Sequence, residues 1–136
     1  MKTATGRTWF IDVDGTIFEH RSNQELDNGV DDVLLPGAKE LLDKIPKSDT
    51  VIITTARMPH HRVITIESFR RFNLRCDSFI FGLGSGARIL INDEKEMKNS
   101  EGIRCKKAHA LSVKRNKGIS HMERNRLLWG CDYGRW

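Results

Sequence analysis

The sequence predicts an α/β fold: one domain built on a doubly wound, Rossmann-like parallel sheet with helices on both faces. Apolar, β-branched stretches alternate along the chain with stretches whose apolar residues recur at helical spacing, and this alternation is typical of a parallel sheet. The chain has 136 residues, enough to bury one hydrophobic core. We expect that core over about residues 8–115, with a basic C-terminal extension over about residues 101–136.

The first half of the chain supplies two strands and a helix. The first strand covers about Thr8–Val13, and the polar residues 17–35 predict an extended loop with a short hairpin. Residues 38–45 carry apolar side chains at helical spacing, and Pro46 ends this predicted helix. Residues 50–54 are β-branched throughout, which predicts a central strand.

The second half adds two helices and three strands. Pro59 suits the first position of a helix that runs to about Phe72. The apolar stripe of this helix consists of Val63, Ile66, Phe69 and Phe72. Residues 78–81 and 87–91 predict a third and a fourth strand, and residues 107–113 a fifth, edge-like strand. A capping-box pattern at residue 120 and a glycine at residue 130 predict a final helix between them.

Composition excludes several classes of protein. Hydrophobic residues make up 38% and charged residues 30% of the chain, which excludes a disordered protein. No apolar stretch approaches the roughly 18 residues of a membrane span, and Asp12 interrupts the apolar region that a signal peptide would need. The three cysteines are odd in number and widely spaced, which argues against a disulfide framework or a zinc cluster. We therefore expect a cytoplasmic protein without a membrane partner.

The basic charge is concentrated at the C-terminal end. Residues 1–100 hold 14 Lys and Arg against 15 Asp and Glu, whereas residues 101–136 hold 9 against 3. Such a tail could bind nucleic acid, but without an aromatic stacking pattern or a known motif a solvated basic face is the favoured interpretation. Trp129, Tyr133 and Trp136 are expected to pack onto the domain, and a homo-oligomer contact through them is left open.

Three predicted strands end in residues that can bind a cation or an anion. Asp12 and Asp14 end the first strand and start out on the same face of it. Thr55 follows the second strand, and Asn92 and Asp93 follow the fourth. If these strands are parallel neighbours, three carboxylates, a hydroxyl and backbone N–H groups meet at one edge of the sheet. Oxygen donors of this kind favour Mg²⁺ with a phosphate beside it.

These residues also carry a family resemblance. Asp12-Val13-Asp14-Gly15-Thr16 resembles the first motif of the haloacid dehalogenase (HAD) superfamily of phosphatases. The strand that ends in Thr55 is similar to the second motif of that family, and Ile91-Asn92-Asp93 to its fourth. The resemblance covers roughly residues 8–95 and leaves no room for a cap domain, so the chain looks like a small capless member.

The resemblance implies a catalytic role for each matched residue. Asp12 would be the nucleophile and form an aspartyl-phosphate, and Asp14 would protonate the leaving oxygen and then deprotonate the hydrolytic water. Mg²⁺ would be held by Asp12, by the main-chain carbonyl of Asp14 and by Asp93. The hydroxyl of Thr55 and the N–H of Ala56 would hold phosphoryl oxygens.

The chain departs from the family pattern in two places. Many members carry two acids at the fourth motif, where this chain has Asn92, which we expect to orient a metal-bound water beside Asp93. The cation of the third motif is not plain in the sequence. Arg88 is the first choice for it and for phosphate binding, Lys95 beside the metal site is the second, and a solvated surface cation is the alternative for either.

Three further residues follow the second motif closely. Arg57 could bind the phosphate or the substrate, and it could equally cap a helix or pair with an aspartate. His60 and His61 are adjacent, so on a helix they would point about 100° apart. On that geometry they cannot hold one metal ion together, and a surface role is expected.

The resemblance implies a Mg²⁺-dependent phosphomonoesterase that acts on a phosphorylated small molecule, such as a sugar phosphate. Two alternatives stay open: a catalytically lapsed domain of the same fold and a phospho-accepting receiver, each serving as a binding or signalling module. A receiver needs no acid beside its phosphorylated aspartate, so the acidic pair Asp12 and Asp14 favours the phosphatase.

Overall fold

The computed structural model describes residues 6–95, 97–98, 102 and 104–121. Their contacts group these residues into two compact units. The sheet unit comprises residues 6–85 and 113–121, and the hairpin unit comprises the described residues between 86 and 112. Each unit is described by itself, and the expectation of one domain over residues 1–136 stays a prediction.

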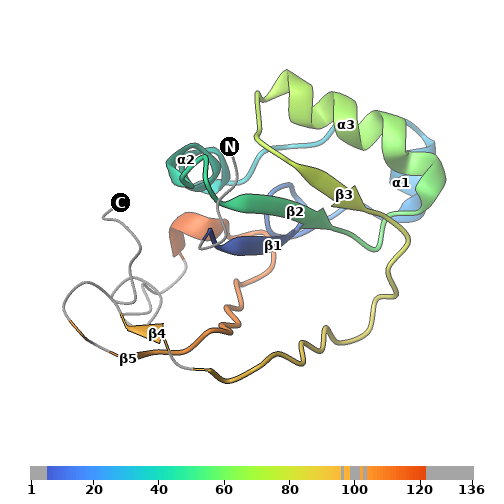
Figure 1. The fold of residues 1–136 in the computed structure, drawn as a ribbon. Coiled ribbons are helices and arrows are strands. Elements are labelled where there is room, and N and C mark those ends of the chain that lie inside the picture. Colours follow the sequence, from blue (N-terminus) through green and yellow to red (C-terminus); the bar gives the residue numbers. More distant parts are fainter. Residues whose placement is uncertain (1–5, 96, 99–101, 103, 122–136) are drawn as a thin grey trace. The chain divides into compact units, whose positions relative to one another are not determined.

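The sheet unit is built on a three-stranded parallel sheet in the order β1-β2-β3 (Figure 1). Its strands are β1 (Thr8–Asp12), β2 (Thr50–Thr54) and β3 (Ser78–Ile80). β1 and β2 pair in parallel from Thr8 opposite Thr50 to Asp12 opposite Thr54. The predicted α/β class and the central place of the β-branched strand are therefore confirmed.

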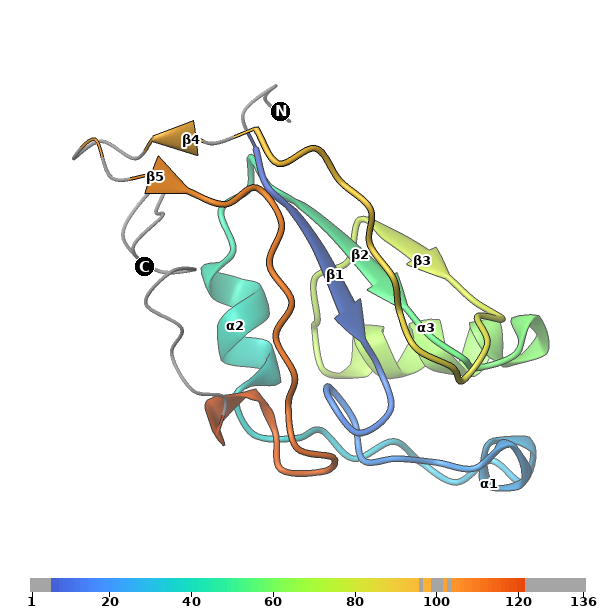
Figure 2. The same cartoon turned by 90° about the horizontal axis from the view of Figure 1, so that it is seen from below.

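The helices that connect these strands lie on one face of the sheet (Figures 1 and 2). They are α2 (Ala38–Lys44), between β1 and β2, and α3 (Arg62–Arg71), between β2 and β3. Right-handed crossovers that step in one direction across a sheet put their helices on the same side. Ile11 and Ile53 are buried under this layer, whereas Phe10, which points to the opposite face, is 57% exposed.

The inward face of α3 differs from the predicted stripe. Val63 is 65% exposed, and the buried residues of α3 are Thr65, Ser68 and Phe69. The ring of Phe69 packs edge-on against Phe18, with 5.5 Å between centroids. Two of the three buried positions are hydroxyl residues because this face covers a buried ion network, described below, whose polar atoms need partners.

Residues 17–35, predicted as a loop, contain the short helix α1 (Asn23–Asp27). A capping box begins it: the Ser22 hydroxyl accepts from the N–H of Glu25, and the Glu25 carboxylate accepts from the N–H of Ser22, both at 3.1 Å. The spacing of Ser22 and Glu25, three residues apart, is the sequence pattern that indicates this helix. The prediction missed the helix because the segment as a whole is polar and was interpreted as a loop.

Residues 113–121 return to the sheet unit and end in the 3-10 helix η2 (Ile119–His121). The N–H of Asn116 donates to the Gly15 carbonyl at 3.0 Å, and the Asn116 side-chain oxygen accepts from the N–H of His20 at 2.8 Å. The strand predicted over residues 107–113 is wrong, since these residues form no strand. Of the final predicted helix, residues 122–130 lie outside the described residues.

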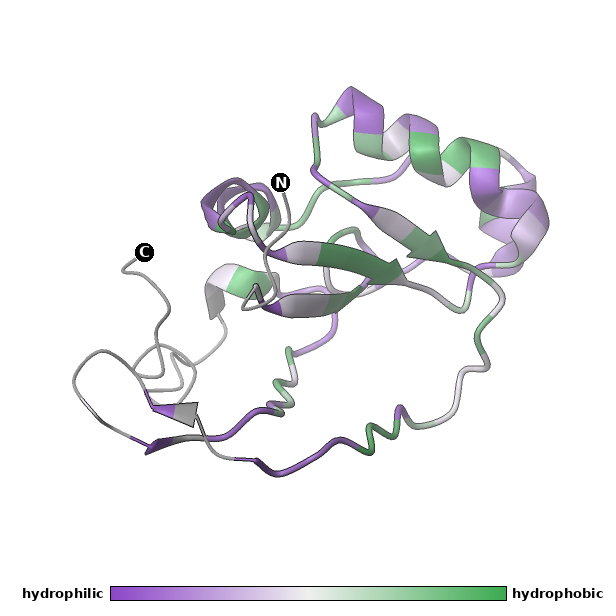
Figure 3. Cartoon of the chain, in the orientation of Figure 1, coloured by the Kyte–Doolittle hydropathy of each residue, from purple (hydrophilic) through white to green (hydrophobic). Residues whose placement is uncertain are grey.

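The hairpin unit contains two short antiparallel strands, β4 (Met97–Lys98) and β5 (Arg104–Cys105). The strand predicted at residues 87–91 is wrong, because these residues have no regular secondary structure. Figure 3 shows their apolar character as a green stretch within this unit, and Ile91 is 93% exposed. An apolar, β-branched run becomes a strand only where a neighbouring strand accepts and donates its backbone hydrogen bonds.

Across the described residues of both units, the helices are too short or too polar to cross a lipid bilayer.

Candidate functional site

The carboxyl ends of β1 and β2 bring the acidic pair and the hydroxyl to one edge of the sheet. Asp12 is the last residue of β1 and lies opposite Thr54, so Asp14 and Thr55 follow closely after the ends of two adjacent strands. Asp12 is exposed, and the Asp14 side chain is 16% exposed. The prediction that Asp12, Asp14 and Thr55 lie at the same edge of the sheet agrees with the parallel register of β1 and β2.

A tight turn fixes the direction of the chain after β1. Gly15 has a φ of 82°, and its N–H donates to the carbonyl of Phe18 at 2.7 Å. The N–H of Ile17 donates to the carbonyl of Val13 at 2.9 Å. A left-handed φ suits glycine, so the Asp14-Gly15 sequence reverses the chain here without side-chain strain.

A second turn follows β2. The N–H of Thr55 donates to the Ile80 carbonyl at 3.0 Å, and the buried Thr55 hydroxyl accepts from the N–H of Arg57 at 3.0 Å. Ala56, between them, is exposed. The turn therefore directs the backbone at Ala56 outward and the side chain of Arg57 inward.

Arg57 is buried, and its guanidinium binds the carboxylate of Asp14 through two hydrogen bonds. Nε donates to Asp14 Oδ2 at 3.0 Å, and Nη2 donates to Asp14 Oδ1 at 2.9 Å. This bidentate geometry matches the planar fork of the guanidinium to the carboxylate plane. It restricts Asp14 to one orientation at the end of β1.

The remaining guanidinium donors are directed to a second carboxylate and a hydroxyl. Nη1 and Nη2 donate to the two oxygens of Asp32 at 3.1 and 2.7 Å, and Nη1 also donates to Thr65 Oγ1 at 3.0 Å. The Ser68 hydroxyl donates to Asp32 Oδ2 at 2.6 Å. All five N–H donors of Arg57 thus have an acceptor. Of the roles predicted for Arg57, pairing with an aspartate is the one that the structure shows.

The pKa of Arg57 is raised above its usual value. Burial alone lowers the pKa of the guanidinium, but hydrogen bonds and charge from Asp14 and Asp32 together outweigh it. The cation is permanent, and it sits between two carboxylates, one facing the sheet edge and one inside the unit. We call Asp14, Arg57 and Asp32 the buried ion network.

Basic residues from the far end of the sequence lie beside the turn after β1. A Cβ atom placed on Gly15 would lie 3.1 Å from Cγ of Arg115, which shows how closely residues 113–118 approach this turn. Lys114 and Lys117 flank Arg115 and are exposed. Sequence reasoning missed this approach, because no periodic pattern links residues about a hundred positions apart.

The other predicted site residues belong to the hairpin unit, where all of them are exposed. Arg88 Nη1 donates to the Gly86 carbonyl at 3.0 Å. The Asn92 amide donates to the main-chain carbonyl of Asp93 at 3.1 Å, and the Asp93 carboxylate accepts from the N–H of Lys95 at 3.2 Å. Metal binding by Asp93, the water-orienting role of Asn92 and the choice between Arg88 and Lys95 stay predictions.

The two adjacent histidines do not diverge as predicted. They lie in the 3-10 helix η1 (Pro59–His61), and the Nε2 atoms of His60 and His61 lie 3.1 and 2.6 Å from the same oxygen, Oδ1 of Asp27. The prediction considered only the helix that carries the histidines. That prediction did not consider Asp27, whose carboxylate at the end of α1 contacts both imidazole rings.

No protein-family model, no curated protein and no solved structure matches the chain. The resemblance to the HAD superfamily therefore rests on the sequence motifs themselves, at Asp12 to Thr16, at Thr55 and at Ile91 to Asp93.

Proposed function

We propose that the chain is a Mg²⁺-dependent phosphomonoesterase of the HAD type, built on a parallel, Rossmann-like sheet. The observation that supports this proposal best is the parallel register of β1 and β2. It puts Asp12, Asp14 and Thr55 at one edge, with Asp14 held by Arg57. A nucleophile, an oriented acid and a hydroxyl at the carboxyl edge of a parallel sheet are the parts that phosphoryl transfer requires.

In the proposed reaction the exposed Asp12 carboxylate attacks phosphorus, and the bond from phosphorus to the ester oxygen breaks. Asp14, which must enter this step protonated, gives its proton to that leaving oxygen and returns to the carboxylate that Arg57 binds. Asp14 then takes a proton from a water molecule, which attacks the aspartyl-phosphate and releases phosphate from Asp12. The N–H of Ala56 would hold a phosphoryl oxygen through both steps, and the Thr55 hydroxyl, which is buried in this structure, would have to turn toward the phosphate to join it.

The donors at this edge fit Mg²⁺, because Asp12 presents a carboxylate and Asp14 a main-chain carbonyl, both hard oxygen ligands. Asp93 is the proposed third protein ligand, with Asn92 beside it. When bound, the cation would neutralise the charge that opposes an anionic substrate at Asp12. Arg88, or failing that Lys95, would balance the remaining negative charge.

Arg57 is proposed as a positioning residue. With its donors occupied by two carboxylates and a hydroxyl, it acts on the reaction through the orientation of Asp14. The substrate class that we propose is a small phosphate ester such as a sugar phosphate.

The test is phosphate release from p-nitrophenyl phosphate, with Mg²⁺ and with a chelator. We expect turnover only with Mg²⁺, and we expect Asp12→Asn to lower kcat by about a thousandfold or more, since the covalent step is lost. Asp31→Asn, at an exposed carboxylate, is the matched control and should keep full activity. Full activity in Asp12→Asn would refute the assignment of the nucleophile.

A second variant separates a phosphatase from a receiver-like module. In Asp14→Asn the phosphoenzyme should accumulate, because the activation of water depends on Asp14, and intact-mass measurement should show one added phosphoryl group. Stable phosphorylation of the native chain without turnover would instead identify a receiver. No phosphorylation of either chain, with no release of phosphate, would leave a catalytically lapsed binding domain.

A further inference from the structure

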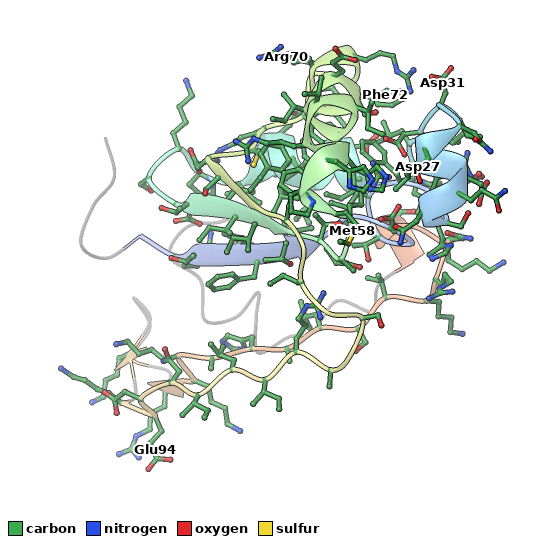
Figure 4. The ribbon with its side chains drawn as sticks, turned by 90° about the vertical axis from the view of Figure 1, so that its right-hand side faces the viewer. Asp27, Asp31, Met58, Arg70, Phe72 and Glu94 are labelled. Carbon is green, nitrogen blue, oxygen red and sulfur yellow. The ribbon has the colours of Figure 1, made fainter. Side chains whose placement is uncertain are left out.

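We propose that Asp27, His60 and His61 form a binding site for a divalent transition-metal ion of the kind that Zn²⁺ represents. Each residue offers one ligand atom, and the three atoms all lie within 4.8 Å of one another. Asp27, labelled in Figure 4, ends α1. The histidines belong to η1, which begins two residues after Arg57. The site is separate from the oxygen-only edge at Asp12 and does not depend on the proposed function.

The cluster has a defined proton arrangement without a metal ion. The N–H of Met58 donates to Nδ1 of His61 at 3.3 Å, so Nδ1 is the unprotonated nitrogen of that ring. Its Nε2 then carries the proton and donates to Asp27 Oδ1 at 2.6 Å. His60 Nε2 lies 3.1 Å from the same oxygen. One carboxylate oxygen is therefore shared by two imidazole rings.

A metal ion bound here would replace the protons between these donor atoms. Metal–donor bonds of about 2.0–2.1 Å in a tetrahedron separate the donor atoms by roughly 3.3 Å. His60 Nε2 and Asp27 Oδ1 are close to that separation at 3.1 Å, whereas His61 Nε2 and Asp27 Oδ1, at 2.6 Å, would have to move apart on binding. Binding would require the proton of His61 to pass from Nε2 to Nδ1, and the N–H of Met58 to turn to water. Met58 is 42% exposed, so water can reach it.

The donor set selects the class of metal. Two imidazole nitrogens and one carboxylate suit Zn²⁺, Co²⁺ or Ni²⁺, whereas Mg²⁺ prefers oxygen ligands alone. The carboxylate contributes one negative charge against the two charges of the cation. The side chains of His60 and Asp27 are 64% and 54% exposed, so solvent can occupy a fourth coordination position.

A metal ion here would link α1 to η1. The segment between α1 and η1 contains Asp32, and η1 begins two residues after Arg57. The two elements that the metal ion would join are therefore both close in sequence to residues of the buried ion network.

The test is a titration of the full chain with Zn²⁺ in which calorimetry measures the heat of binding. Absorption spectra with Co²⁺ in place of Zn²⁺ give a second readout. We expect one Zn²⁺ per chain at this site and an increase in the temperature of unfolding on binding. His60→Ala and Asp27→Asn should each lower the affinity for Zn²⁺ at least tenfold. Both side chains are more than half exposed, so these variants should fold as the native chain does.

Three controls make the result specific. His109→Ala removes a histidine outside the cluster and should change the Zn²⁺ affinity less than twofold. Asp12→Asn should likewise leave it unchanged, which separates this site from the proposed Mg²⁺ edge. A Co²⁺ spectrum without a thiolate charge-transfer band excludes the cysteines as ligands. Absence of Zn²⁺ binding to the native chain, or equal affinity in the native chain, His60→Ala and Asp27→Asn, would overturn the proposal.

Discussion

At the scale of single residues, Arg57 links the interior of the sheet unit to the carboxyl edge of its sheet. Burying a guanidinium is unfavourable unless its charge and all its donors are satisfied, and here two carboxylates and a hydroxyl do so. Asp14 faces the edge, and Asp32 is enclosed by α3. The network is therefore sensitive to changes at Asp32, although Asp32 acts on the proposed reaction only through Arg57 and Asp14.

We predict that Asp32→Asn destabilises the chain and slows the reaction together. Removing one charge from a buried pair leaves Arg57 undercompensated, at a cost of about 3–5 kcal/mol. Asp14 loses its fixed orientation, so kcat should fall while KM stays near its native value. Urea denaturation and steady-state kinetics measure the two effects. The matched control is Asp31→Asn, which removes the exposed neighbouring carboxylate and its 3.4 Å pair with Arg71 and should change neither quantity appreciably.

Cys76 allows a second prediction at this scale. Burial raises the pKa of its thiol from the usual 9.0 to about 11, and its Sγ donates to the Ser78 carbonyl at 3.0 Å. At pH 8 the fraction of thiolate is then roughly a hundredfold lower than in the unfolded chain. In a Cys105→Ser, Cys131→Ser background, alkylation followed by mass spectrometry should be slow in the native state and fast in urea. Equal rates in both states would contradict the prediction.

At the scale of elements, the accuracy of sequence interpretation follows from what stabilises each element. Residues 50–54 form the predicted strand, and residues 38–44 the predicted helix, because a local pattern of β-branched or amphipathic residues specifies each. Residues 87–91 share the first pattern but pair with no strand among the described residues of their unit. The stripe on α3 was misassigned because its inward positions, Thr65 and Ser68, serve the ion network, which no periodicity reveals.

The residues of the candidate site likewise fall into those that the sequence predicts and those that it does not. Asp12, Asp14 and Thr55 could be predicted, since strand ends in a parallel sheet share an edge. The partners of Arg57 could not be deduced, because Asp32 comes from a polar segment without a pattern. The approach of Asp27 to the histidines was missed for the same reason. Pairings between distant residues depend on tertiary packing, which a single sequence does not encode locally.

Asp49, directly before β2, accepts hydrogen bonds from residues at the start of β1, and these bonds make the stability of the chain depend on pH. Its oxygens accept from the Arg7 N–H at 3.0 Å, from Arg7 Nε at 2.9 Å and from Trp9 Nε1 at 3.0 Å. Burial raises the pKa of this carboxyl, but these hydrogen bonds and the charge of Arg7 together hold the pKa below its usual value of 3.8. A depressed pKa stabilises the fold above the unfolded value, and this contribution is lost as pH falls through the folded value.

We therefore predict that Asp49→Asn costs about 1.5–3 kcal/mol near neutral pH. The difference from the native chain should stay constant down to about pH 4 and shrink as the pH is lowered further, since the native carboxylate is then protonated. Urea denaturation between pH 7 and pH 3 measures both chains. A difference that does not depend on pH would show that packing, and not the charge of Asp49, is responsible.

At the scale of the whole chain, the path of the polypeptide explains why residues 113–121 belong to the sheet unit. They return after the hairpin unit and lie against two turns, the one after β1 and the one before α2. Two glycines permit the second contact. Gly37 and Gly118 have φ values of 88° and 86°, and a Cβ on either would lie 2.4 Å from a backbone atom across the contact. This return carries three basic residues toward the acidic edge that we propose as catalytic.

The last prediction tests whether that return matters for function. In Gly118→Ala the new Cβ would lie 2.4 Å from the carbonyl oxygen of Pro36, so residues 113–121 must move away from the turn before α2. Gly29→Ala is the matched control, since Gly29 has a similar φ of 73° but nothing within 4 Å of its Cβ position. Both substitutions incur the left-handed backbone cost of about 1–2 kcal/mol, so the excess loss in Gly118→Ala measures the contact alone.

If residues 113–118 assist an anionic substrate, Gly118→Ala should also raise KM for p-nitrophenyl phosphate, because Arg115 and its neighbours leave the turn at Gly15. Gly29→Ala should leave KM unchanged. Loss of stability in Gly118→Ala with a native KM would assign the return a structural role only, and the basic charge would then act elsewhere.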